Sequence, residues 1–131
     1  MTTTYNREII STDKAPAAVG TYSQGTLHNG VYYFSGQIGL DPETMLLHES
    51  FDDQLTQIMK NIDGLLDHCG ITRDHIIKTS IFMTDLALFT KVNEAYVEFF
   101  KEPYPARSCV QVPALPKGAQ VEIEVIAAEG K

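Results

Sequence analysis

The stretch that decides the fold runs from Ser50 to Gly70 and reads SFDDQLTQIMKNIDGLLDHCG. Its apolar residues recur at the spacing of one helix face, which predicts an amphipathic helix. Ser50 with Asp53 resembles an N-terminal capping box, and Gly70 can close the helix in the left-handed conformation. Gly64 is expected on the exposed face, where a glycine costs up to about 1 kcal/mol. The apolar stripe consists of Leu55, Ile58, Met59, Ile62, Leu65, Leu66 and Cys69.

A strand and a second helix follow this first helix. Residues 76–83 are rich in β-branched and apolar side chains and predict a strand. Asp85 can cap a second helix, which must end before Pro103. This helix also carries a single apolar stripe, formed by Phe89, Val92, Tyr96, Phe99 and Phe100.

The remaining strands lie toward the two ends of the chain. The Asn-Gly pair at 29–30 is a strong hairpin signal, so residues 26–28 and 31–38 are expected to pair antiparallel. Residues 107–112 and 121–128 predict two more strands, separated by a proline-containing loop and expected to form a second hairpin. A further short strand is expected at residues 7–10.

Two helices with one apolar stripe each imply a sheet that is covered on one face only. The residues therefore predict a single α+β domain over 1–131. Side chains alternate along a strand, so the last two strands are expected to turn a polar set away from the helices. That face would be exposed to solvent, an interface between copies, or a site. The polar set consists of Arg107, Cys109, Gln111, Glu122 and Glu124.

Composition excludes several classes of function. The 131 residues include 10 basic and 17 acidic side chains, a net charge of −7, so we expect no nucleic-acid partner. No apolar run approaches the roughly 20 residues of a membrane span, and the N-terminus lacks a signal-peptide pattern, so a cytoplasmic protein without a membrane partner is expected. The two cysteines form no CxxC pattern and the four histidines show no ligand spacing, so no metal site is expected.

Arg107 and Glu122 are the strongest candidates for chemistry. An arginine fork matches a carboxylate with two hydrogen bonds, and a glutamate can orient and deprotonate water. Two plainer interpretations stand beside these. Arg107 could form a salt bridge with a glutamate of the neighbouring strand, and Glu122 could belong to a solvated strand face.

Other residues have weaker signals. Asn93 interrupts an apolar stripe, so its amide must either bind a ligand or tie the helix to a loop. Ser35 and Gly36 interrupt an apolar strand, which suggests a bulge or a close backbone approach. Tyr22 could donate a hydroxyl group or simply pack its ring, and Cys109 is interpreted as a small strand residue.

The sequence resembles the RidA family, also called YjgF/YER057c/UK114. The most specific matching run is residues 105–112, PARSCVQV, followed by LPKG at 115–118 and VEIEVIA at 121–127. Upstream matches are APAA at 15–18, GTYSQG at 20–25, SGQI at 35–38 and Val92-Asn93. The resemblance covers nearly the whole chain. It implies a chorismate-mutase-like fold, with two helices packed on one face of a mixed sheet, and a homotrimer with sites between subunits.

The resemblance also implies an activity without a cofactor: hydrolysis of 2-iminobutanoate, 2-iminopropanoate and their enamines, which pyridoxal-phosphate enzymes release, to 2-oxo acids and ammonia. In that chemistry Arg107 would hold the substrate carboxylate with help from the backbone N–H of Cys109, and Glu122 would activate water. Tyr22, Ser35, Gly36 and Asn93 would line the pocket.

Two alternatives to the deaminase remain. One is a non-catalytic trimer that binds metabolites or acts as a holdase, which would need the arginine but not the glutamate. The other is an endoribonuclease, against which the net charge of −7 argues.

Overall fold

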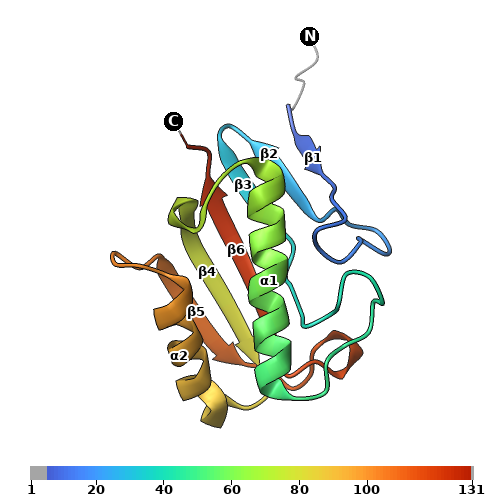
Figure 1. The fold of residues 1–131 in the computed structure, drawn as a ribbon, viewed down its shortest axis with the longest axis vertical. Coiled ribbons are helices and arrows are strands. Elements are labelled where there is room, and N and C mark those ends of the chain that lie inside the picture. The colour runs from blue at the N-terminus through green and yellow to red at the C-terminus, as the bar shows by residue number, and fades with distance from the viewer. Residues whose placement is uncertain (1–5, 131) are drawn as a thin grey trace.

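The computed structural model describes residues 6–130, and its longest element is the predicted first helix (Figure 1). This helix, α1, spans Phe51–Cys69. The Ser50 hydroxyl accepts a hydrogen bond from the Asp53 N–H at 3.1 Å, and Gly70 ends the helix with φ 71°. Both predicted helix boundaries are therefore confirmed.

The expectation that Gly64 lies on an open helix face is wrong. A Cβ atom at this position would stand 2.1 Å from the carbonyl oxygen of Lys14. The loop that carries Lys14 is also tied to α1 by an ion pair between Lys14 and Asp67. Gly64 is therefore needed for the close approach of this loop, which accounts for a glycine inside a helix.

The second helix, α2, spans Phe89–Phe99 and buries Val92, Tyr96 and Phe99. Asp85 does not cap this helix directly. Its carboxylate accepts from the Ala87 N–H at 2.9 Å and so caps a short 3₁₀ turn, Leu86–Leu88, that leads into α2. The predicted N-terminal cap thus acts one turn earlier than expected.

The six strands form one sheet in the order β1-β2-β3-β6-β4-β5. The predicted hairpin of β2 and β3 is confirmed, and its turn carries Asn29 and Gly30 with positive φ angles. The strand bounds are Glu8–Ile10 for β1, Gly25–His28 for β2, Val31–Phe34 for β3, Ile76–Met83 for β4, Ala106–Gln111 for β5 and Val121–Ala128 for β6.

The expected hairpin of the last two strands is wrong. β4 lies between β5 and β6, pairing parallel with β5 and antiparallel with β6. The physical reason is that α2 connects β4 to β5 as a crossover, and a crossover helix returns the chain parallel to the strand it left. The chain then passes through a 3₁₀ turn, Pro116–Gly118, before β6 inserts in the middle of the sheet.

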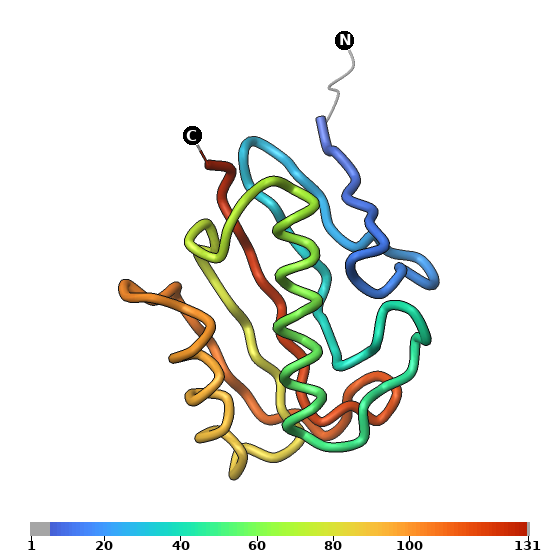
Figure 2. The backbone as a smooth tube through the Cα atoms, in the orientation of Figure 1, coloured from blue at the N-terminus to red at the C-terminus, as the bar shows by residue number. Residues whose placement is uncertain are grey.

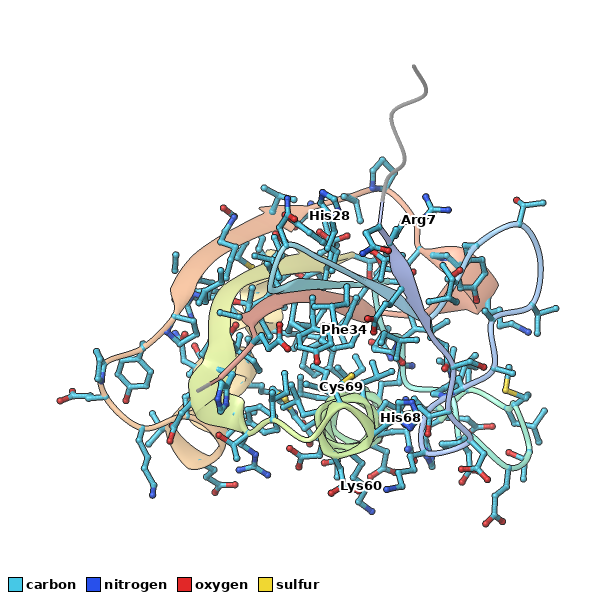
Figure 3. The ribbon with its side chains drawn as sticks, turned by 90° about the horizontal axis from the view of Figure 1, so that it is seen from above. Arg7, His28, Phe34, Lys60, His68 and Cys69 are labelled. Carbon is cyan, nitrogen blue, oxygen red and sulfur yellow. The ribbon has the colours of Figure 1, made fainter. Side chains whose placement is uncertain are left out.

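Both helices pack on the same face of the sheet, as predicted (Figure 1). In the view from above, α1 is seen end-on beneath the sheet, with Phe34 and Cys69 between them and Lys60 on the outer side of the helix (Figure 3). The core between the two layers includes Ile58, Ile62 and Ile123, each at most 1% exposed. The opposite face of the sheet has no layer over it among residues 6–130.

Two long loops gather beside β3 and β6 at one edge of the molecule (Figure 2). Residues 35–50 connect β3 to α1, and residues 112–120 connect β5 to β6. The two loops meet where the Gln120 side-chain amide donates to the Glu49 carbonyl at 3.2 Å. Their meeting forms the wall of the cavity described next.

Candidate active site

Four of the predicted site residues line one cavity of about 480 Å³ at this edge. They are Tyr22, Ser35, Gly36 and Glu122. The volume lies within the range of small-molecule sites. The structure thus brings together the proposed water-activating carboxylate and three of its proposed neighbours.

Glu122 reaches this cavity because β6, after pairing with β3, also pairs with the segment that follows β3 through an isolated bridge. Gln37 and Ile123 exchange two backbone hydrogen bonds, of 2.8 and 3.0 Å. This places the Glu122 carboxylate against the Gly36 backbone, where a Cβ atom would stand 2.8 Å from the carboxyl carbon. The glycine at position 36 therefore leaves the space that the carboxylate occupies.

The Glu122 carboxylate is half-buried and has no hydrogen-bond or ion-pair partner within residues 6–130. Burial, and secondly the charge of Glu124 two residues along the strand, raise the pKa of this carboxyl above its usual value. A carboxylate with a raised pKa and free oxygen atoms is suited to exchange protons with water.

Ser35 holds the loop that carries Tyr22 in place through hydrogen bonds. Its hydroxyl group donates to the Ser23 carbonyl at 2.6 Å, and its N–H donates to the Gln24 carbonyl at 2.9 Å. Gln24, only 4% exposed, anchors the preceding loop through bonds to backbone atoms of Thr12, Ala15 and Pro16. Tyr22 itself is 55% exposed, so its ring is not packed into the core.

Arg107 and Asn93 line a different cavity, of about 370 Å³, between α2 and β5. The Arg107 Nη1 donates to the Asn93 side-chain oxygen at 2.8 Å. The guanidinium also lies over the rings of Phe89 and Tyr96, 5.0 and 5.1 Å from their centres. Asn93 therefore ties its helix to the arginine, which was not among the two interpretations of this residue.

The predicted salt bridge of Arg107 with a neighbouring glutamate is absent from the described residues. Its Nε and Nη2 atoms have no hydrogen-bond partner there, and the side chain is exposed. A positively charged fork that is oriented by an amide and stacked on two rings is ready to bind a carboxylate.

Cys109 lies beside this arginine on the edge strand β5. Burial raises the pKa of its thiol, so the sulfur is not an activated nucleophile. The Val112 N–H donates to the Met83 carbonyl of β4 at 2.8 Å. Because N–H groups alternate along a strand, the N–H of Cys109 points to the free edge, where it can meet a ligand.

The expectation that Arg107 and Glu122 share one polar face is wrong. Arg107 pairs with Thr79 of β4, and Glu122 pairs with Phe82 of the same strand. Thr79 and Phe82 are three residues apart, so their side chains, and those of their partners, point to opposite faces. The Thr79 hydroxyl contacts the Tyr96 hydroxyl, which places Arg107 and Cys109 on the helix-covered face.

The two groups are also far apart in the plane of the sheet. Arg107 and Glu122 are separated by two strand spacings across the sheet and by three residues along the strands, which is about 10 Å in each direction. A small ligand held by Arg107 therefore cannot reach Glu122 of the same chain. Within one chain the predicted residues form two separate half-sites, one around Glu122 and one around Arg107.

Several residues of these half-sites were missed by the sequence analysis. Val19, Met45 and Lys117 line the Glu122 cavity, and Tyr104 lines the Arg107 cavity. The loops that bring them there give no periodic signal. Residues 6–130 contain no cluster of three or more potential metal-ligating side chains, and none of their helices is long and apolar enough to cross a membrane.

Comparisons with known proteins show which family and fold the chain shares. A family model described as Endoribonuclease L-PSP matches residues 12–129. The human protein named 2-iminobutanoate/2-iminopropanoate deaminase is 42% identical over 125 residues, which are 95% of this chain and 91% of that protein. The crystal structure of RidA from an Antarctic Psychrobacter species has a TM-score of 0.89 and 49% identity, covering 92% of this chain and 98% of the other.

A second similar structure contains a bound amino acid. It is Escherichia coli TdcF with bound serine, which has a TM-score of 0.88 and 40% identity. The match covers 94% of this chain and 99% of that chain.

Proposed function

The chain belongs to the RidA family, and from this membership we propose that it is a deaminase that hydrolyses 2-imino acids to 2-oxo acids and ammonia. The observation that carries the proposal is the pair of oppositely charged groups, Arg107 and Glu122, each of which lines its own cavity and has polar atoms free to bind a ligand. 2-Iminobutanoate and 2-iminopropanoate are the proposed substrates, because the human relative is named for them.

The proposed site is completed by a second copy of the chain in a homotrimer. Arg107 of one subunit would approach Glu122 of the next, since the two cannot meet within one chain. Edge strand β5 supports this arrangement, because five of its six residues are exposed. The uncovered sheet face also exposes large apolar residues, which favours contact with another copy. They include Ile9, Tyr33 and Val110, each about half exposed.

In the proposed reaction the substrate carboxylate binds the free Nε and Nη2 of Arg107 and the edge N–H of Cys109. Glu122 takes a proton from water as the water oxygen adds to the carbon of the protonated imine, which gives a neutral carbinolamine. Glu122 then returns this proton to the nitrogen, ammonia leaves, and the hydroxyl proton passes to solvent as the C2 carbonyl of the 2-oxo acid forms. The raised pKa of Glu122 suits both steps, because one group must act first as base and then as acid.

No metal or cofactor is needed for this chemistry, because an imine already reacts with water. The protein contributes an anchor, a positioned water and a proton acceptor. The bound serine in the related TdcF structure supports an anchor for a carboxylate, since serine carries one. The endoribonuclease named in the family description is less well supported, because a net charge of −7 disfavours a phosphate backbone.

The test is a coupled assay in which threonine dehydratase supplies 2-iminobutanoate and semicarbazide competes for it. The wild-type protein should accelerate 2-oxobutanoate release and suppress semicarbazone formation. Arg107→Lys should lower kcat/KM by about 10- to 100-fold, because it keeps the charge but loses the fork. Glu122→Gln should bind 2-oxobutanoate nearly normally and hydrolyse slowly.

The matched control is Glu94→Gln, an exposed carboxylate on α2 next to Asn93, which should keep full activity. If Arg107→Lys and Glu122→Gln lose activity only in proportion to lost folding, the two residues are structural and the deaminase proposal fails. A metabolite-binding or holdase role would instead leave Glu122→Gln as effective as the wild type.

A further inference from the structure

The lining of the Glu122 cavity includes apolar side chains that the proposed chemistry does not use. They are Val19, Ile38, Leu40 and Met45. If the carboxylate of a 2-imino acid is held at the mouth and its C2 atom lies at Glu122, the remaining substituent is the substrate side chain. An apolar wall is the surface that such a side chain would contact.

Met45 stands out on this wall because of its backbone. It has φ 60°, the left-handed region in which a side chain is disfavoured by roughly 1–2 kcal/mol. Lys117, with φ 58°, is in the same conformation and lines the same cavity. Only three non-glycine residues among 6–130 have positive φ angles, and two of them meet here. Such strain concentrates at functional sites.

The turn that carries Met45 is held by its own hydrogen bonds. The Met45 N–H donates to the Asp41 carbonyl at 2.8 Å, and the Asp41 N–H donates to the Leu46 carbonyl at 3.0 Å. The Asp41 carboxylate accepts from the N–H groups of Glu43 and Thr44. The side chain of Met45 then packs on the small apolar cluster of Ile38, Leu40 and Ala119.

Three buried amides of α1 fasten the same loop to the body of the protein. Asn61, fully buried, donates to the Leu40 carbonyl at 3.0 Å and accepts from Gln57 at 2.8 Å. Gln54 donates to the His48 carbonyl at 2.9 Å and accepts from the Gln120 N–H at 2.9 Å, two residues before Glu122. The wall and the carboxylate thus have a common, rigid support.

From this arrangement we infer that Met45 is a specificity-determining residue, whose side chain closes the inner end of the pocket and restricts the enzyme to 2-imino acids with short side chains. The inference rests on the proposed function for the placement of the substrate. A fixed wall excludes a longer side chain by steric overlap, whereas a mobile loop would yield to it. Each methylene that a pocket admits or rejects changes kcat/KM by about tenfold or more.

The test compares two substrates on three variants. An amino-acid oxidase generates the imines of 2-aminobutyrate and of leucine in place, with semicarbazide as the competing trap. Met45→Ala and Met45→Gly should each raise the kcat/KM ratio of the leucine imine to the shorter imine by at least about tenfold. The matched control is Leu46→Ala, the next residue in the same turn, which is 69% exposed and should leave the ratio unchanged.

Binding of the corresponding 2-oxo acids separates this inference from the proposed function. Titrations with 2-oxobutanoate and 4-methyl-2-oxopentanoate, followed by NMR, should show the same selective gain for the longer ligand in both Met45 variants. If the wild-type protein hydrolyses no imine, the proposed function fails. The gain in binding would still support the inference that Met45 limits the length of the ligand side chain. The inference about Met45 is overturned if Met45→Ala and Met45→Gly both fold and neither changes the preference for the longer over the shorter compound. That preference is measured by imine turnover or, where turnover is absent, by 2-oxo acid binding.

Discussion

Replacing Gly36 by alanine tests the geometry of the carboxylate with the smallest possible change. The added methyl group would stand 2.8 Å from both the carboxyl carbon and one oxygen of Glu122. Ordinary contacts of this kind are about 3.5 Å or longer, so the carboxylate must move by roughly 1 Å. A displacement of that size at a reacting group can cost about 100-fold in rate. We therefore expect Gly36→Ala to lower imine turnover by about two orders of magnitude.

The same substitution should hardly affect stability. The atoms that the new methyl group meets are the flexible end of a side chain, which can turn away, and Gly36 does not have the positive φ that would strain an alanine. The assay pairs the coupled imine hydrolysis with thermal unfolding. A double variant with Glu122→Gln supplies the control, since Gly36→Ala should cost little more once the carboxylate is gone. Full activity of Gly36→Ala, or an equal loss in both backgrounds, would refute the reasoning.

Three further predictions concern charge and packing. Because the pKa of Glu122 is raised, kcat/KM should fall as the pH drops through a pKa that is higher than that of an ordinary glutamate. Glu124→Gln removes a like charge and should move this acid limb of the kcat/KM profile to lower pH. Asn93→Asp should weaken 2-oxobutanoate binding by about tenfold more than Asn93→Ala, measured by titration, because a carboxylate at 2.8 Å would neutralise Arg107. Gly64→Ala should lower the urea midpoint, although alanine favours helices by about 1 kcal/mol, because its Cβ would collide with the Lys14 carbonyl; a raised midpoint would contradict that contact.

The helices and their faces were predictable because local periodicity determines them. α1 begins and ends where the Ser50 cap and Gly70 indicate, and its stripe faces the sheet. Gly64 was misjudged because the residue that explains it, Lys14, lies 50 positions earlier, and no local pattern reports such a contact. Backbone contacts between distant segments are visible only in three dimensions.

The order of the last strands could have been predicted from a pattern in the sequence that the hairpin prediction ignored. A strand, a helix and a strand in succession favour a parallel crossover, and β4, α2 and β5 form one. Applying that rule would have placed β5 parallel to β4 rather than in a hairpin with β6. The insertion of β6 between β3 and β4 has no comparable local signal, because it depends on pairing between the two ends of the chain.

The candidate residues themselves came from the sequence, while their division into two half-sites did not. Tyr22, Ser35, Gly36 and Glu122 gather in one cavity, as their proposed roles require. Met45 and Lys117 join them from loops whose left-handed residues carry no recognisable pattern. Side-chain alternation alone could not reveal that Arg107 faces the helices, because on the exposed edge strand β5 the more apolar set, which includes Val110, is the one turned away from them.

Subunit complementation tests the central claim most directly, namely that one site takes Arg107 from one chain and Glu122 from another. Arg107→Lys and Glu122→Gln proteins are unfolded together, refolded as an equal mixture and assayed for imine hydrolysis beside each variant refolded alone. In a random cyclic mixture about one site in four receives both native residues, so roughly a quarter of the wild-type rate should return. A mixture no more active than its separate components, in oligomers shown to be mixed, would contradict the account.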